Sequence, residues 1–534
     1  FETNPSVDVS CTDAVTGTKQ IQMLGLSGPN TMIGIENMPG IRGLSSNVGL
    51  SFIPGTWIQS IQVTKGVGSV VNGYESIAGQ INVEMKKPQD SEQLFLNLYG
   101  NQSGRTEMNL NFTQLVGEKW GTTVLLHGSV RPIEHDQNDD GFLDFPTTSQ
   151  LNFVNRWLYK GSGNVMGQFG VKIMTDDKLG GQVAYNEHED RGTMNAYGLE
   201  INTNRYEAWG KIGYLNKAKP YQSVGLQVSA TRHEQEAYFG LTAYDATQNT
   251  VYGNLIYQSI IGTTQHKFKT GMSLLYDQYD EQLTIGDFAR EEIVPGAFIE
   301  YTYSYLDKFT LIAGLRADHN NLFGTFLTPR LHTRYMIAEN TILRASLGRG
   351  QRTANIFAEN ISLLATSRQL RFTNQQSAYG YGFEPNAAWN FGFNLTQEFR
   401  LNYRPATLLV DFYRTNFEDQ VVIDVDTPGE VTFMGLAGKS YSNSLQAELN
   451  YELTRRFDMR LAYRWIDVQT DYQQGLNAKP LIAKNRAFIN LAYKTKNSWA
   501  FDLTTQWVGT QRLPNTTGSP EAYQLISYSP DYAL

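Results

Sequence analysis

The stretch SLQAELNYEL, residues 444–453, places two kinds of side chain in strict alternation. The apolar set is Leu445, Ala447, Leu449, Tyr451 and Leu453, and the polar set is Gln446, Glu448, Asn450 and Glu452. Successive side chains of a β-strand point to opposite faces, so the pattern predicts a strand with one apolar face and one wet face. FDMRLAYRW, residues 457–465, repeats the pattern a few residues later.

The alternation recurs in segments of about 10 to 15 residues, and about 19 complete strands can be read between residues 92 and 513. Tight connections such as VGEK, GSGN and GTTQ follow every second strand. The connections between them include long polar ones: 133–149, 177–196, 352–386, 425–439, 472–484 and 514–530. Short turns at one rim and long loops at the other are typical of outer-membrane barrels, whereas a soluble sandwich has no reason to keep that order.

An outer-membrane barrel also has to close, because an open sheet edge in lipid leaves backbone polar groups unpaired. Single-chain bacterial barrels close with an even number of strands, and one more strand begins near Asp531. We therefore predict an all-β fold in which residues 91–534 form a transmembrane antiparallel β-barrel of about 22 strands. The last two or three of these strands are expected to be absent from this chain.

Composition agrees with a barrel and excludes several other classes of protein. The 534 residues include 48 Gly and 12% aromatic residues, which suit turns and strands. A mean hydropathy of −0.38, with no run of about 20 apolar residues, excludes a helical membrane protein. The formal charge of −8 argues against nucleic acid as a partner, and the single Cys11 rules out an intramolecular disulfide. No Ser/His/Asp spacing, HExxH motif or phosphate loop stands out, so we do not expect an enzyme.

Residues 1–90 differ from the rest of the chain and are predicted to form a plug domain inside the barrel. They are rich in Gly, Ser and Asn, and their short apolar segments WIQSIQVTKG and GQINVEMKKP lack the long alternation. A barrel this wide encloses a water-filled hole unless something occupies it. In GVGSVVNGYESIAGQINVEMKKP, residues 66–88, the glycines permit the tight turns of a compact domain before the chain enters the barrel wall.

Four passages of the chain resemble TonB-dependent outer-membrane receptors. IRGLSS (41–46) and SIQVTKGVGSVVNGYESIAGQINVEMKKP (60–88) resemble the plug motifs of that family. TPRLHTRYMIAENTILRASLGRGQRTANIFAEN (328–360) and FEPNAAWNFGFN (383–394) resemble its mid-barrel strands, with Arg352 and Glu359 at matching positions. The chain departs from the family pattern at Gln62, Lys65, Val67, Gln80 and Ala354.

The resemblance implies a protein of the bacterial outer membrane, surrounded by outer-membrane lipid, that imports a scarce and bulky solute. TonB would energise the import by binding a short N-terminal box, which we expect to be missing from this chain together with the first part of the plug. The resemblance also implies that basic plug residues, Arg42 and Lys65, pair with acidic barrel residues such as Glu359. We predict an Arg42–Glu359 contact, since a confined ion pair holds the plug and can still be broken by a pull.

HDQNDDGFLDFP, residues 135–146, contains a pattern that is independent of the resemblance. It fits D-x-N-x-D-G-x-x-D, the first nine positions of a calcium loop. The predicted ligands are Asp136, Asn138, Asp140, the Phe142 carbonyl and Asp144. Thr147 stands where a bidentate Glu would complete the shell, so a merely acidic exposed loop is the alternative. We predict a structural Ca²⁺ in an outer loop and no catalytic cofactor.

The solute is predicted to touch outward-facing plug loops and the long loop 352–386. The plug candidates are Gly28, Pro29, Asn30, Met32, Ser45, Ser46 and Asn47, and the loop candidates are Arg368, Arg371, Tyr379 and Tyr381. Arg and aromatic side chains suit an anionic or aromatic chelate. Met23, Met32 and Met38 would suit a soft metal such as copper, or simple packing. NEHEDRGTM, residues 186–194, is either a weak metal site or a solvated loop.

Together these features predict active import of a metal chelate, a siderophore or a metal ion such as iron or copper. One alternative is an importer of carbohydrate or peptide that pairs with a surface lipoprotein, although such chains are usually far longer. The other alternative is a passive porin or an adhesin, and a plug disfavours the porin.

Overall fold

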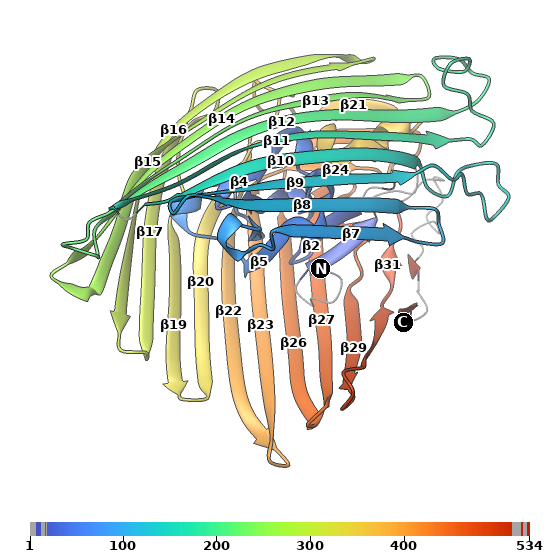
Figure 1. Ribbon diagram of the computed structural model, residues 1–534. Helices are drawn as coiled ribbons and strands as arrows, with labels where there is room; N and C mark the ends of the chain where they lie inside the picture. The colour runs from blue at the N-terminus through green and yellow to red at the C-terminus, as the bar shows by residue number, and fades with distance from the viewer. Residues whose placement is uncertain are drawn as a thin grey trace.

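The computed structural model describes residues 7–11, 17, 19–161, 163–514, 525–526 and 531–533. Within these ranges no helix has the length and the apolar content that crossing a membrane requires. Most strands form one large barrel, which Figure 1 shows curving around the N-terminal elements. The barrel strands are β7 (Leu94–Gly100), β8 (Thr106–Val116), β9 (Trp120–Arg131), β10 (Thr147–Lys160), β11 (Val165–Gly181), β12 (Gly198–Leu215), β13 (Ser223–Phe239), β14 (Thr242–Ile261), β15 (Thr263–Leu283), β16 (Gly286–Tyr305), β17 (Phe309–Asn320), β18 (Gly324–Leu327), β19 (Arg330–Ala338), β20 (Thr341–Arg352), β22 (Asn386–Leu401), β23 (Arg404–Asp419), β26 (Ser440–Thr454), β27 (Phe457–Tyr472), β28 (Gly475–Ala478), β29 (Asn485–Lys494), β30 (Ala500–Val508) and β33 (Asp531–Ala533).

Barrel strands that follow one another in the chain lie side by side in the wall, and the order closes from β33 to β7. β18 and β19 both pair with β17, and β28 and β29 both pair with β27, so each of these two pairs makes a single passage. β31 (Gln511–Arg512) and β32 (Leu525–Ile526) form a separate two-stranded sheet. In the described part of the chain, 22 strand segments therefore make 20 passages of the wall, and the predicted fold class, a large antiparallel barrel, is confirmed.

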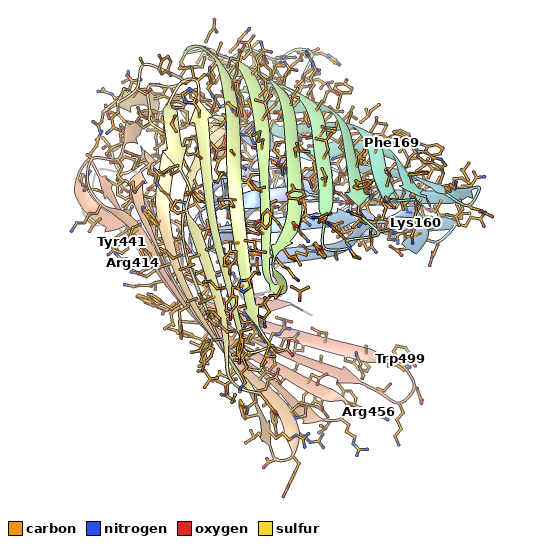
Figure 2. The ribbon with its side chains drawn as sticks, turned by 90° about the vertical axis from the view of Figure 1, so that its left-hand side faces the viewer. Lys160, Phe169, Arg414, Tyr441, Arg456 and Trp499 are labelled. Atoms are coloured by element: carbon orange, nitrogen blue, oxygen red, sulfur yellow. The ribbon has the colours of Figure 1, made fainter. Side chains whose placement is uncertain are left out.

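The two faces of the wall carry the two sets of side chains that the alternation separates. On β14, Val251 and Leu255 face outward and are 49% and 47% exposed, whereas Tyr252 and Asn254 face the lumen and are buried. Figure 2 shows side chains standing on both faces of the curved sheet. The apolar outer face therefore meets lipid, and the lumen face is mixed and polar.

Tight turns and long loops fall on opposite rims, as predicted, except that several hairpins on the outer rim are also tight, among them β13–β14, β15–β16, β17–β18 and β27–β28. β14 begins at Thr242 and β16 begins at Gly286, so the hairpins before them are tight instead of long. In the sequence the apolar alternation becomes clear only near Asn249 and Glu291. These strands run on beyond the lipid, where their outward side chains are polar and their inner face packs under the outer loops through residues such as Tyr244 and Phe288. Without an apolar outer face, the hydrophobic period of a lipid-facing strand is lost there.

The N-terminal elements lie inside the ring of barrel strands (Figure 1). They are β1 (Val7–Cys11), β2 (Lys19–Met23), η1 (Gly28–Asn30), β3 (Thr31–Ile35), β4 (Met38–Ile41), η2 (Gly43–Ser45), η3 (Gly49–Phe52), η4 (Gly55–Trp57), β5 (Ile58–Lys65), η5 (Val70–Asn72), β6 (Gly79–Met85) and η6 (Pro88–Asp90). One sheet has the order β4-β3-β6-β5, and β1 pairs with β2 as a separate hairpin. We call residues 7–90 the plug.

Two outer loops fold together over the plug. The first contains η7 (Ala358–Ala365) and β21 (Gln369–Thr373), and the second contains β24 (Val421–Asp424) and β25 (Glu430–Gly435). β25 pairs in parallel with β21 and antiparallel with β24, so the two loops share one small sheet. We call residues 353–385 and 420–439 the lid. Alternation across the chain did not indicate this sheet, because its strands are short and lie inside polar loops.

Replacing Leu255 by Arg should destabilise the barrel, because it would bring a charge to the lipid-facing middle of β14. The free energy of unfolding should fall by about 2–4 kcal/mol. Thr247→Arg, on the same face nearer the outer rim, is the control and should cost about 0–1 kcal/mol. Urea unfolding of the protein from lipid vesicles measures both costs, and equal costs would contradict the assignment of this face to lipid.

Candidate functional site

Arg42 joins the top of the plug to the barrel wall. It lies between β4 and η2, and its guanidinium pairs with Glu75 of the plug, Nη2 to Oε1 at 2.8 Å, and with Asp277 of β15. Burial alone would lower the pKa of Arg42, but the charges of Asp277 and Glu75 outweigh burial and raise that pKa well above its usual value. The predicted contact between Arg42 and Glu359 is wrong, because Asp277 is the barrel partner of Arg42.

Glu359, in the lid, pairs with Arg352 at the end of β20. Its Oε1 accepts from Nη1 of Arg352 at 2.8 Å and its Oε2 accepts from Nη2 at 2.5 Å. The backbone N–H of Asn355 also donates to Oε1, at 2.7 Å. This bidentate pair holds the first turn of η7 against the end of β20. Arg352, seven residues before Glu359, neutralises the Glu359 carboxylate. Glu359 therefore does not take part in the ion pair with the plug that its position in the motif suggested.

Two further sets of ion pairs tie the plug to the C-terminal half of the wall. Lys65 of β5 pairs with Asp411 of β23. Asp8 of β1 pairs at once with Arg464 of β27 and Arg486 of β29. The plug is therefore attached to this side of the wall at both its first strand and its β5–β6 hairpin.

Glu36 ties the plug to the opposite side of the wall. It lies at the tip of the β3–β4 hairpin with φ of 56°, and its carboxylate is 3.0 Å from Nη1 of Arg156 and 3.5 Å from Nζ of Lys211. Burial alone would raise the pKa of Glu36, but Arg156 and Lys211 hold that pKa below its usual range. Glu36 is therefore a buried carboxylate whose charge is matched by the wall.

A cavity of about 30 Å³ lies where the plug meets the lid. Its lining includes Pro29, Met32 and Ser46 from the predicted plug loops, together with Arg42 and Glu359. One water needs about 10–15 Å³ of such space, so the cavity takes water and excludes a chelate in this arrangement. The structure thus brings three of the seven predicted plug residues to one place, beneath a closed lid. The others are buried in the plug: Gly28, Asn30, Ser45 and Asn47.

The three plug methionines do not gather. Met32 lines the cavity, whereas Met23 and Met38 are buried in two separate apolar clusters. Among the residues that the structure describes, no group of three or more His, Cys, Asp or Glu side chains is placed to hold a metal ion. This includes NEHEDRGTM, where the His188 side chain is 85% exposed and its Nε2 lies 3.3 Å from the carboxylate of the neighbouring Glu187.

An aromatic cluster holds the lid closed. Phe357 is 1% exposed, and its ring centroid lies 5.5 Å from that of Tyr381, 6.0 Å from that of Phe433 and 5.2 Å from that of Phe288 on β16. Leu44 of the plug is buried in the same cluster. The cluster therefore joins both loops of the lid to the wall and to the plug.

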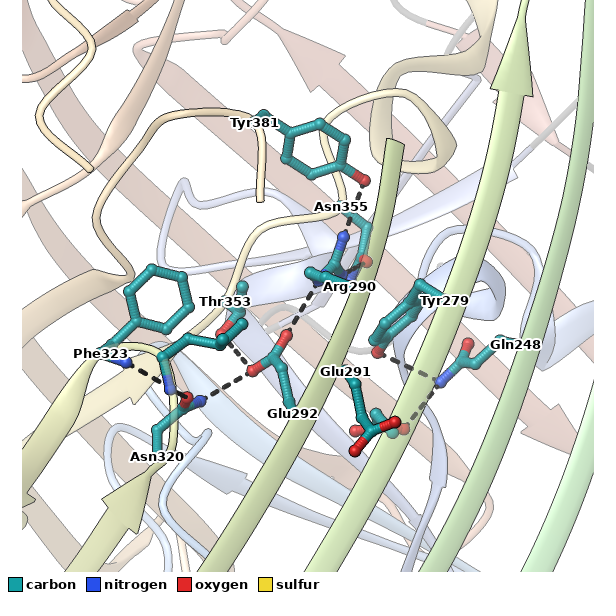
Figure 3. Close-up of polar contacts among 12 residues, drawn as sticks. Gln248, Tyr279, Arg290, Glu291, Glu292, Asn320, Phe323, Thr353, Asn355 and Tyr381 are labelled. Carbon is teal, nitrogen blue, oxygen red and sulfur yellow. Dashed lines mark hydrogen bonds and ion pairs between the residues drawn. The ribbon is translucent and has the colours of Figure 1, made fainter. Parts of the chain in front are cut away.

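Tyr381 adds a polar contact between the lid and the wall (Figure 3). Its hydroxyl donates to Glu281 of β15 and accepts from Nη1 of Arg290 on β16 at 3.1 Å. Burial, and then the charge of Glu281, raise the pKa of Tyr381 well above its usual value, so the phenol keeps its proton. Arg290 also donates to Glu292 at 2.9 Å and to Asn355 of the lid.

The other loop residues predicted to bind solute do not reach the cavity. Arg368 donates to the carbonyl of Val425 at 3.3 Å. Arg371 pairs with Glu430 at 2.8 Å, and its side chain is 51% exposed. Tyr379 is 48% exposed and faces outward. These three residues belong to the outer surface of the lid or to its internal contacts.

The predicted calcium loop folds on its own amides. The Asp136 carboxylate accepts from the N–H groups of Asp140 at 3.1 Å and Gly141 at 2.9 Å, and Asp144 accepts from that of Gln137 at 3.0 Å. These carboxylates form no cluster of the kind that holds a metal ion. A Ca²⁺ ion bound by Asp136, Asn138, Asp140, Phe142 and Asp144 stays a prediction.

Sequence reasoning missed the wall residues that receive the plug. Gln248 of β14 accepts from the N–H of Leu44 at 2.9 Å and donates to Asp277 and to Tyr279, each at 3.2 Å (Figure 3). In the sequence Gln248 and Asp277 are two of many polar residues on lumen faces, and no local signal separates them from the rest.

A family model described as TonB dependent receptor-like, beta-barrel, matches residues 88–534. The chain belongs to the TonB-dependent receptor family. It is 22% identical over 376 residues to the vitamin B12 transporter BtuB of Vibrio vulnificus (strain CMCP6). That match covers 64% of this chain and 55% of the relative, so the chain spans about half the length of the curated relative.

Solved structures of receptors share the fold. A ferric enterobactin receptor, PfeA, from Pseudomonas aeruginosa superimposes with a TM-score of 0.74 at 11% identity, over 99% of this chain and 86% of that one. The copper transporter OprC superimposes with a TM-score of 0.75 at 15% identity, over 96% of this chain and 81% of that one. This TonB-dependent receptor is therefore a protein of the bacterial outer membrane.

Replacing Arg42 by Gln should lower the free energy of unfolding by about 3–5 kcal/mol, because Asp277 and Glu75 lose their counter-charge while buried. Adding Asp277→Asn should recover part of the loss, since it removes one of the two stranded charges. Arg371→Gln breaks an exposed pair, serves as the control, and should cost less than about 1 kcal/mol. Guanidinium unfolding in detergent measures all three, and equal losses for the two arginines would contradict the assignment.

Titration of the purified protein with CaCl₂ should release or absorb heat if residues 136–144 bind the ion. The double variant Asp136→Asn/Asp140→Asn should lose that heat, because it removes two of the charged ligands. MgCl₂ is the control ion, since Mg²⁺ demands a tighter octahedral shell. The absence of Ca²⁺ heat in the unaltered protein would contradict the prediction.

Proposed function

We propose that this protein imports a scarce solute across the outer membrane and that TonB supplies the energy. The observation that carries the proposal is a lumen filled by a plug that ion pairs and hydrogen bonds tie to the wall, alongside apolar packing. Polar contacts of this kind hold a plug at rest, and water can replace them one by one when the plug is pulled. A permanent pore needs no such plug.

We propose further that the solute is a metal chelate or siderophore, with a bare metal ion as the second choice. The relatives are named for vitamin B12, ferric enterobactin and copper. Among the described residues, no group of His, Cys, Asp or Glu side chains suited to a metal ion lies at the plug. Of the three plug methionines, Met32 alone lines the cavity. Both facts favour a solute that brings its own ligands to the metal.

The closed lid sets a requirement on the solute. The cavity of about 30 Å³ under the lid is far smaller than a chelate, so binding has to displace the aromatic cluster around Phe357. The displaced cluster would offer aromatic faces and the guanidinium of Arg290 to the solute. Such a surface suits an anionic or aromatic chelate.

Uptake by cells tests the proposal. The full-length protein would be expressed with its own TonB in a strain that lacks other receptors, and cells would be supplied with radiolabelled iron chelates or copper. We expect uptake of one of these to depend on the protein and to fall to background when a protonophore removes the energy source. Arg371→Gln, on the lid surface, is the control and should transport normally.

Other outcomes would favour the alternatives. A passive porin would continue uptake after the protonophore is added. An importer of carbohydrate or peptide would take up labelled oligosaccharides or peptides, and neither iron nor copper, and it would need a surface lipoprotein for full activity. Either result would overturn the proposed import of a metal chelate.

A further inference from the structure

One plug side chain, that of Asn47, contacts both the lid and the N-terminal hairpin. Asn47 follows η2 and is 8% exposed. Its Nδ2 donates to the carbonyl of Glu359 and, at 3.4 Å, to that of Ala358, while its Oδ1 accepts from Nε2 of Gln20 at 2.5 Å. Both polar atoms of the Asn47 amide are therefore hydrogen-bonded. They connect the start of η7 in the lid with β2 in the plug.

The two elements at the ends of this bridge differ in kind. Ala358 and Glu359 begin η7, which follows directly on Phe357 at the centre of the aromatic cluster of the lid. Gln20 lies on β2, opposite Ser10 of β1, in the hairpin at the N-terminal end of the plug. A displacement of the lid and a displacement of the N-terminal hairpin thus act on the same buried amide.

A buried amide makes the two displacements interdependent. If η7 moves away, Nδ2 of Asn47 loses its acceptors while it stays inside the protein, which costs the desolvation of an unsatisfied donor. The amide can recover partners by rotating or by moving toward water, and either change breaks its bond to Gln20. Two neighbouring polar links of the plug, from Leu44 to Gln248 and from Arg42 to Asp277, lead to the barrel wall instead.

Apolar packing offers a parallel connection. Val422 and Met434 of the lid share a cluster with Val7, Ile21 and Met23 of the hairpin. Contacts of this type are non-directional and can slide without a large loss, whereas the amide is lost when either partner shifts by about an ångström. The two connections can therefore be separated by substitution at Asn47.

We propose that Asn47 is the positioning residue that couples opening of the lid to release of the β1–β2 hairpin. In the closed state it holds the hairpin through Gln20, and solute that displaces η7 loosens the hairpin through the same side chain. The role of this coupling in transport rests on the import function proposed above. The coupling itself is a property of the protein without solute.

Hydrogen exchange of the full chain in nanodiscs tests the coupling. Phe357→Ala opens the lid by removing the central ring, and we expect the backbone amides of Lys19–Met23 to exchange about fivefold faster, the factor for one net hydrogen bond. In the Asn47→Ala background these amides should already exchange faster, and Phe357→Ala should add nothing. No solute is needed, so a failure of the uptake experiment leaves this test unaffected.

Ser45→Ala is the matched control. Ser45 is buried in the same part of the plug, and its hydroxyl donates to the Arg42 carbonyl at 2.9 Å, away from the bridge. In that background Phe357→Ala should still accelerate exchange at Lys19–Met23. If Phe357→Ala destabilises the whole chain, Tyr381→Phe replaces it, because it removes only the hydroxyl that binds Glu281 and Arg290.

Three results would overturn the proposal. The lid variant could leave the exchange of residues 354–365 unchanged, which would show that the cluster does not hold the lid. It could accelerate exchange in the lid and leave Lys19–Met23 unaffected. The acceleration at Lys19–Met23 could also persist at full size in the Asn47→Ala background, which would assign the coupling to the apolar packing.

Discussion

Backbone hydrogen bonding in lipid is the constraint on which this structure depends. A membrane interior offers no water to unpaired N–H and C=O groups, so a sheet can cross it only by pairing every strand on both sides. The order of the barrel strands meets this demand by returning from β33 to β7. Closure then forces one face of each strand toward lipid and the other toward an enclosed lumen, and the alternation in the sequence follows from that geometry.

A lumen lined by polar side chains decides how the plug can be held. Apolar packing joins parts of the plug to the wall, and attachment at Arg42, Glu36, Lys65 and Asp8 adds matched charges that satisfy the polar lumen face. Removing one member of such a pair is costly, whereas moving the plug as a whole lets water take over both members. The same contacts thus give firm attachment at rest and a route to release under load.

The lid changes what the plug presents to the outside. The two outer loops share a parallel strand pair and bury Leu44 of the plug in their aromatic cluster. The lid consequently covers the outer end of the plug, and the space of about 30 Å³ left beneath it has room only for water. In the proposed import a solute has to displace the lid before it reaches the plug, and Asn47 is the plug side chain that contacts the start of η7.

The sequence by itself determined the barrel, the order of short turns and long loops, and the separate character of the first ninety or so residues, because a period of two is a local property that lipid imposes on every strand. It also pointed to Arg42 and Lys65 as residues of the plug that face the wall. Which acid each would meet was decided only by the tertiary structure. Asp277 lies 235 positions from Arg42, and Glu359 was satisfied by its neighbour Arg352. The lid sheet was likewise invisible in the sequence, because its strands are only four to six residues long and their apolar side chains are buried by contacts with the plug and the wall that no local period reveals.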